Sequence, residues 1–123
     1  MNIYTKLNKT LATIDETRPQ SKKKRKRSKV RELERKRYSI LTDDLTICFK
    51  CKRPKQDLHE IYEGRNRQNS MKHGFVIPLC RECHYWIHHD IGLAEYYKQI
   101  CQKEYERTHS RKEFMDIIHR NYL

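Results

Sequence analysis

The chain has 123 residues, of which 36% are hydrophobic and 36% are charged, and its net charge is +12 at pH 7. This length allows at most one ordinary domain, and a core that draws on three Phe and one Trp is thin. Residues 1–20 contain no apolar run, and no stretch approaches the length of a membrane span. The sequence therefore predicts a soluble, cytoplasmic protein without a membrane partner.

The N-terminal part, residues 1–40, is predicted to be a basic arm that is partly disordered and partly helical. Residues 4–14 favour a short helix. Residues 22–37 hold eleven Lys or Arg and two Glu, a net charge of +9. The first half of this run has no apolar residue, which indicates a disordered or extended segment, whereas residues 28–41 have helical spacing.

Such a density of cations is typical of segments that contact nucleic-acid phosphates, although a solvated tail and a nuclear-import signal also fit the run. We expect little sequence preference in this contact, because phosphate contacts read no base edges. The residues predicted to make it are Lys22, Lys23, Lys24, Arg25, Lys26 and Arg27. The remainder, residues 41–123, is predicted to be one zinc-bound domain.

Two C-x-x-C pairs, Cys48/Cys51 and Cys80/Cys83, are separated by 28 residues. Each tight turn presents two thiolates, and the chain between the pairs can fold back to close a tetrahedral four-cysteine zinc site. Disulfides are disfavoured, because the pairs are too closely spaced to bridge comfortably and the chain has five cysteines. The sequence therefore predicts a structural zinc ion, with the fifth cysteine, Cys101, as a small buried residue of a helix.

The segment between and after these pairs predicts a small α+β unit. Residues 58–62 and 75–79 favour short strands, and residues 64–70 read as a polar loop between them. Residues 81–90 favour a helix, with Gly92 placed to end it.

Two more helices are predicted to cover this unit. Residues 93–108 have helical spacing, and Ser110 with Glu113 forms a capping box that opens the last helix. The tyrosines of this region are expected to pack in the core rather than to bind a ligand. They are Tyr96, Tyr97, Tyr105 and Tyr122.

Three histidines form a second predicted metal site. His84 and His88 lie four residues apart on the predicted helix, so their rings project from one face and can bind one ion. His59, on the first predicted strand, can supply a third nitrogen. Three protein ligands leave coordination positions open, as catalytic metal sites require. A helix fixed at its start by a zinc-bound cysteine pair would preorganise this site.

The order of these motifs resembles the HNH endonuclease, or ββα-metal, family, in the variant that carries a four-cysteine zinc site. The resemblance spans about residues 45–90 and rests on Cys48-Phe-Lys-Cys51, on Leu58-His59-Glu60-Ile61, and on Leu79-Cys80-Arg-Glu-Cys83-His84 with His88. The chain looks most similar to small phage and prophage members of the recombination-enhancement nuclease type. The resemblance implies metal-dependent hydrolysis of DNA in a bacterial host cell, with recombination or other phage proteins as partners.

By this resemblance, His59, His84 and His88 hold a catalytic divalent ion, which would be Mg, Mn, Ni or Zn. The family's general base is normally a histidine directly after the first ligand, and here that position is Glu60. Glu60 is open to three interpretations. It is a weaker base, a metal ligand, or a sign that efficient cleavage has been lost.

A second departure concerns an Asn that the family places nine residues before the helix histidine. This chain has Phe75 there. Asn66, Asn69 and His73 are alternatives in the predicted loop, and spacing does not choose among them.

Two functions therefore follow from the sequence. The first is a metal-dependent DNA endonuclease with His59, Glu60 and His84 as catalytic residues and with Arg65 and Arg67 on the flanking phosphates. The alternative is a non-catalytic, zinc-stabilised nucleic-acid-binding protein with an HNH-like fold, in which the histidines are vestigial or structural.

Overall fold

The computed structural model describes residues 29–123, and the chain divides after Arg35 into two compact units. This boundary lies five residues before the predicted one. Within the first unit, residues 29–35 are helical, and Arg35 forms an ion pair with Glu32. The helix predicted at residues 4–14, the predicted disorder of the basic run and the predicted DNA contacts of residues 22–27 lie outside the described residues.

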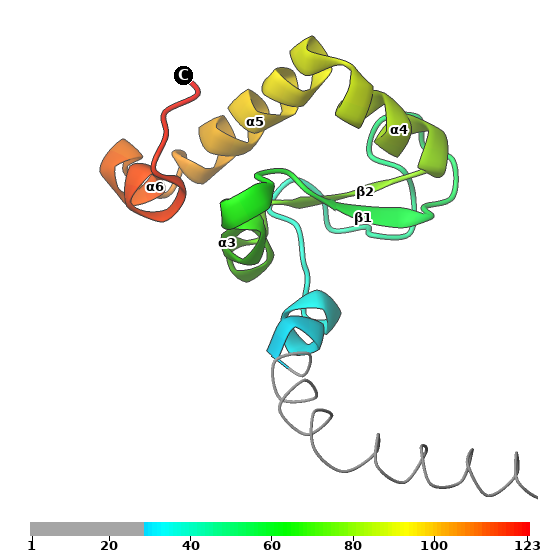
Figure 1. Cartoon of the computed structure of the whole chain (residues 1–123), viewed down its shortest axis with the longest axis horizontal. Helices are drawn as coiled ribbons and strands as arrows, with labels where there is room; N and C mark the ends of the chain where they lie inside the picture. The colour runs from blue at the N-terminus through cyan, green and yellow to red at the C-terminus, as the bar shows by residue number, and fades with distance from the viewer. Residues whose placement is uncertain (1–28) are drawn as a thin grey trace, which may run out of the picture. The chain divides into compact units, whose positions relative to one another are not determined.

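The second unit, residues 36–123, has a small α+β fold built on a two-stranded antiparallel sheet. The strands β1 (Asp57–Glu60) and β2 (Val76–Leu79) lie side by side (Figure 1). In their register, His59 is opposite Ile77. The sheet contacts α3 (Arg67–His73) and α4 (Arg81–His89), and α4 contacts α5 (Ile91–Tyr105). The elements in chain order are β1 (Asp57–Glu60), η1 (Gly64–Asn66), α3 (Arg67–His73), β2 (Val76–Leu79), α4 (Arg81–His89), α5 (Ile91–Tyr105) and α6 (Arg111–Ile118).

The polar loop predicted at residues 64–70 is wrong, because this segment forms η1 and most of α3. Ser70 explains the difference. Its hydroxyl accepts a hydrogen bond from the Tyr62 backbone N–H at 3.1 Å and donates one to the Tyr62 carbonyl at 2.8 Å. Only Ser70 and Met71 of α3 are buried, so the helix shows no apolar periodicity and depends on tertiary contacts.

Gly92 does not end a helix, contrary to the prediction. The break between α4 and α5 lies at Asp90, whose N–H bonds to the Trp86 carbonyl and whose carboxylate accepts a hydrogen bond from the Leu93 N–H at 3.1 Å. One aspartate thus ends one helix and caps the next, so Gly92 falls in the first turn of α5. The capping box of Ser110 is confirmed at the start of α6.

The helix of residues 29–35 does not continue beyond Arg35, although helical spacing in the sequence extends over residues 28–41. Ile40 donates its N–H to the Gly74 carbonyl at 2.9 Å, and the Tyr38 hydroxyl donates to the Lys72 carbonyl at 3.2 Å. These bonds place residues 38–40 across the end of α3.

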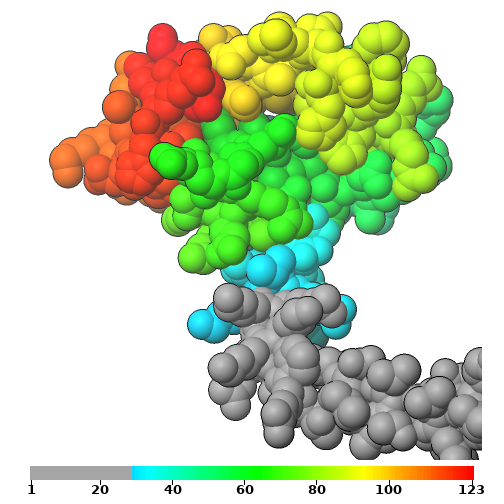
Figure 2. Space-filling view, in the orientation of Figure 1, coloured from blue at the N-terminus to red at the C-terminus, as the bar shows by residue number. Residues whose placement is uncertain are grey.

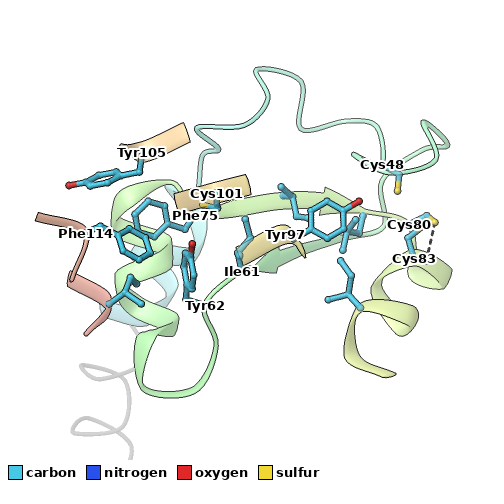
Figure 3. Close-up of a cluster of buried hydrophobic side chains, with 14 residues drawn as sticks. Cys48, Ile61, Tyr62, Phe75, Cys80, Cys83, Tyr97, Cys101, Tyr105 and Phe114 are labelled. Atoms are coloured by element: carbon cyan, nitrogen blue, oxygen red, sulfur yellow. Dashed lines mark hydrogen bonds between the residues drawn. The ribbon is translucent and has the colours of Figure 1, made fainter. Parts of the chain in front are cut away.

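The hydrophobic core runs along the sheet and between the helices. Figure 3 shows Tyr62, Phe75 and Phe114 gathered at one end, and Cys48, Cys80 and Cys83 at the other. The rings of Tyr62 and Phe75 are 5.4 Å apart, and Tyr62 donates its hydroxyl to the Lys98 carbonyl at 2.6 Å. Aromatic rings therefore supply much of the volume of a core that is otherwise small.

The core predictions are confirmed with one exception. Cys101, Tyr97 and Tyr105 are buried, and Tyr122 lies with its ring 5.4 Å from that of Tyr62. Tyr96 is 58% exposed, so its predicted role in packing is wrong. It lies on the solvent side of α5, next to the buried Tyr97.

The C-terminal residues are bonded to the start of α3. The Asn66 side-chain amide donates to the Ile118 carbonyl at 3.0 Å, and that of Asn69 donates to the Ile117 carbonyl at 3.2 Å. Figure 2 shows the C-terminal residues in red against the green residues around α3. None of the helices in residues 29–123 is both long and apolar enough to cross a membrane.

Gly74 provides a test of this packing. Its φ is +75°, and a Cβ there would collide with the Tyr38 ring, whereas Gly64 has a φ of +63° with open space around it. We expect Gly64→Ala to cost about 1 kcal/mol of unfolding free energy through backbone strain alone. Gly74→Ala should cost a further ~1–3 kcal/mol because the ring must move. Denaturant unfolding of the zinc-loaded proteins measures both, and equal losses would contradict the Tyr38 contact.

Candidate metal centres

The four cysteines of the two C-x-x-C pairs come together as the sequence predicts. Cys48, Cys51, Cys80 and Cys83 each place a sulfur within 4.8 Å of the others. The Sγ atoms of Cys51 and Cys80 are 3.6 Å apart. Tetrahedral zinc with Zn–S bonds of about 2.3 Å separates its sulfurs by about 3.8 Å, so the spacing fits a structural zinc ion.

The backbone forms the same tight turn in both pairs. The Cys51 N–H points at the Cys48 sulfur at 3.5 Å, and the Cys83 N–H points at the Cys80 sulfur at 3.4 Å. Such N–H groups stabilise thiolates, because they bring partial positive charge to sulfur. The turns meet because backbone bonds join the first pair to β2, including Phe49 N–H to the Pro78 carbonyl at 2.8 Å.

Arg53 adds positive charge at the cysteine cluster. Its Nε donates to the Cys51 sulfur at 3.2 Å, and this bond holds the pKa of Cys51 at about 6, which favours the thiolate form that binds metal. Burial has the opposite effect on Cys83 and raises its pKa to about 12. A bound cation would offset that desolvation, since zinc binding and deprotonation of the thiol are coupled.

The three predicted histidines also converge. His59 comes from β1, and His84 and His88 come from successive turns of α4, with ring nitrogens within 4.8 Å of one another. The Nε2 atoms of His84 and His88 are 3.0 Å apart. Two nitrogens on one tetrahedral zinc lie about 3.3 Å apart, so this pair fits a shared ion.

The His59 ring is buried, with 3% of its side-chain surface exposed, whereas His88 is 43% exposed. Burial, together with the smaller effects of the neighbouring His84 and His88, lowers the pKa of His59 to about 3. His59 is therefore neutral at physiological pH, which is the protonation state that ligates a metal. The cluster is closed on the strand side and open on the helix side.

Two carboxylates that were not predicted from the sequence, those of Asp57 and Glu63, lie beside this cluster. Asp57 Oδ2 is 3.2 Å from His84 Nδ1, and the hydrogen bond holds the pKa of Asp57 below its ordinary value. The Glu63 oxygens are each 3.7 Å from a ring nitrogen, one of His59 and one of His88. Period-two alternation along β1 could have pointed to Asp57, because it shares a face with His59. Glu63 follows the strand and carries no such signal.

Glu60, the predicted base or ligand, is not brought to the histidines. Successive side chains of a β-strand point to opposite faces, so the Glu60 side chain lies on the face of β1 opposite to that of His59. There its Oε1 atom forms ion pairs with Arg37 at 3.0 Å and Arg67 at 3.3 Å. This arrangement counts against Glu60 as a ligand of the ion that the three histidines would share.

The other predicted site residues lie elsewhere. Phe75 is fully buried in the core, and the amides of Asn66 and Asn69 bond to the C-terminal end of α6. The His73 ring stacks on Phe75 with centroids 5.8 Å apart. Asn66 and Asn69 therefore serve the packing of α3. Arg65 is exposed, and Arg67 is 43% exposed while paired with Glu60.

The cysteine assignment predicts a loss of both zinc and fold on substitution. Cys80→Ser should remove one equivalent of bound zinc and abolish cooperative unfolding, because the ion contributes folding free energy that this small core lacks. Cys101→Ala is the matched control, since Cys101 is buried outside the cluster. It should retain the zinc and lose about 1 kcal/mol. Metal analysis with thermal unfolding reads both, and a zinc-loaded, cooperatively folding Cys80→Ser protein would contradict the assignment.

Comparison of the chain with protein-family models, with curated proteins and with solved structures gives no significant match.

Proposed function

We propose that this protein is a metal-dependent endonuclease of the HNH type that hydrolyses DNA phosphodiester bonds and is encoded by a phage or prophage. The observation that carries the proposal is the convergence of His59, His84 and His88 from one strand and one helix. The order of two antiparallel strands followed by the ligand-bearing helix is the order that the resemblance implies. A second, cysteine-only cluster at the start of that helix supports a division into a structural and an open site.

The open site suits phosphate chemistry. A divalent ion at three nitrogens would neutralise charge on a phosphate oxygen and on the leaving oxygen as the bond breaks. His59 is buried on the protein side of the site. His88 is exposed, so a phosphate can approach the ion from solvent on that side. The ring centroid of His84 is 5.2 Å from that of His59 and 4.8 Å from that of His88, and its Nδ1 atom lies against Asp57. The residues thus hold the ligand nitrogens in place before substrate arrives.

DNA binding in this proposal is electrostatic. Residues 36–123 carry sixteen Lys or Arg against twelve Asp or Glu, so most of the excess positive charge lies N-terminal to this unit. Within it, Arg65 follows β1 and is exposed, so its guanidinium can contact a flanking phosphate, whereas the guanidinium of Arg67 already pairs with Glu60. We therefore expect binding that weakens steeply with salt, because counterion release would supply most of the affinity.

One observation favours the alternative, a zinc-stabilised nucleic-acid-binding protein without catalysis. The side chain in the position of the family's general base, Glu60, is paired with two arginines on the far face of β1. A side chain held in this way is not free to accept a proton from water at the histidine cluster. In this alternative, the four cysteines bind a structural zinc ion, and the three histidines are vestigial or structural residues without a catalytic role.

Nicking of supercoiled plasmid with Mg, Mn, Ni or Zn separates the two functions. We expect the wild type to nick with at least one of these ions, and His84→Ala to lose at least ~100-fold in rate because the ion loses a ligand. His89→Ala is the matched control, since His89 lies on the same helix, is exposed and stacks on Tyr85. It should nick like the wild type. Wild-type inactivity with every ion would favour the binding protein, and undiminished nicking by His84→Ala would refute the site.

The role of Glu60 is tested by Glu60→Gln. Because the carboxylate pairs with Arg37 and Arg67, we expect a loss of about 1–2 kcal/mol in unfolding free energy and an unchanged affinity for the second ion. Nicking should fall less than ~10-fold, whereas loss of a general base costs ~100-fold or more. Glu60→His provides the comparison, because it restores the family residue but removes the ion pairs. Isothermal titration, unfolding and nicking rates together distinguish an ion-pair anchor from a base and from a ligand.

A further inference from the structure

The Asp57 carboxylate is fixed between two residues of α4. Its Oδ2 atom is 3.2 Å from His84 Nδ1, and its Oδ1 atom is 3.5 Å from the Arg81 guanidinium. The side chain is only 27% exposed. A carboxylate accepts hydrogen bonds and has no proton to donate at neutral pH, so the proton of this contact belongs to His84 Nδ1. His84 is therefore left with its lone pair on Nε2.

The Glu63 carboxylate lies against the other helix histidine. Its Oε2 atom is 3.7 Å from His88 Nδ1, and its Oε1 atom is 3.7 Å from His59 Nε2. These distances are longer than a hydrogen bond and suit a charge contact or a bridging water. The carboxylate thus stands at the edge of the cluster, on the Nδ1 side of His88.

The two ring nitrogens that face away from these carboxylates face each other. His84 Nε2 and His88 Nε2 are 3.0 Å apart, and both rings belong to one helix. Two neutral imidazoles with a proton on Nδ1 both direct a lone pair toward this shared point. The same two nitrogens with protons on Nε2 would instead repel one another and any cation.

We propose that Asp57 and Glu63 are positioning residues that hold the Nδ1–H tautomers of His84 and His88 and so direct both Nε2 atoms toward one divalent ion. The proposal rests on the metal-binding part of the proposed function and requires no cleavage of DNA. It assigns two carboxylates from β1 and from the turn after it to a role that Glu60, on the opposite face of the strand, does not fill. Outer-shell carboxylates of this kind raise ligand basicity and limit ring rotation.

Affinity of the full-length protein for a second ion tests the proposal without any activity measurement. Protein that holds one equivalent of zinc in the cysteine site is titrated with Co²⁺, and binding is followed by visible absorption. We expect Asp57→Ala to weaken this binding ~10–100-fold and Glu63→Gln to weaken it ~3–10-fold, because its contact is longer. The control is Glu95→Gln, which removes one negative charge from the same small hollow that Glu63 and His88 line. It should change the affinity less than ~2-fold.

Ring-nitrogen chemical shifts in the wild type supply a second readout that does not depend on a variant folding. Long-range ¹H–¹⁵N spectra of protein with zinc in both the cysteine site and the histidine site should show His84 and His88 protonated at Nδ1 and ligated through Nε2. Ligation of either ring through Nδ1 would overturn the proposal, as would Asp57→Ala and Glu63→Gln proteins that bind Co²⁺ like the wild type. Asp57→Asn separates charge from hydrogen bonding, because its amide oxygen still accepts the Nδ1 proton. We expect it to bind more tightly than Asp57→Ala.

The outcomes for the two proposals are distinct. Wild-type protein that binds the second ion through both Nε2 atoms but does not nick DNA would refute the nuclease and leave this inference in place. Wild-type protein that nicks DNA while His84 or His88 binds through Nδ1 would refute the inference alone. A wild type that takes up no second ion would refute both.

Discussion

The meeting of two C-x-x-C turns at the start of α4 is the constraint on which the rest of this unit depends. The first turn is bonded to the end of β2, and the second turn caps α4, so the helix begins at a fixed point relative to the sheet. Four sulfurs at this point either repel as thiolates or are desolvated as thiols, and the buried Cys83 shows the cost in its raised pKa. A bound cation would remove that conflict and would fix the start of the helix in a domain with few large apolar residues.

The rigid start of α4 has a consequence one turn further along. His84 follows Cys83 directly, and His88 lies on the next turn of the same face, so both rings are carried to β1 by the geometry of the cysteine cluster. The buried His59 of β1 lies against both rings, with centroid distances of 5.2 Å to His84 and 5.4 Å to His88. The candidate open site is thus built from rigid elements rather than from loops, and two carboxylates next to it compensate the charge that an ion would bring.

Glu60 shows how one strand serves two purposes. Asp57 and His59 face α4, while Glu60 pairs with Arg37, the last residue of the basic run, and with Arg67, which follows the strand. The Arg37 side chain is only 18% exposed, and Arg37 is the last residue of the segment, residues 22–37, that carries most of the net positive charge. The strand therefore links the end of the basic segment to the histidine cluster through residues on its opposite faces.

The sequence by itself predicted that the four cysteines and the three histidines form two clusters, and it predicted the two strands, the capping box of α6 and a helix at residues 93–108, which the structure has as α5, because spacing rules for ligands and caps are local. It did not determine α3, whose polar residues depend on the hydrogen bonds of Ser70 to Tyr62, nor the turn at Asp90 that places Gly92 inside a helix. Strand alternation in the sequence places Asp57 on the face of His59 and Glu60 on the other face, but it does not show that α4 packs against that face. Only the tertiary structure brings Asp57 to His84 and Glu63, which lies beyond the strand, to His59 and His88, since a contact between distant segments leaves no local pattern.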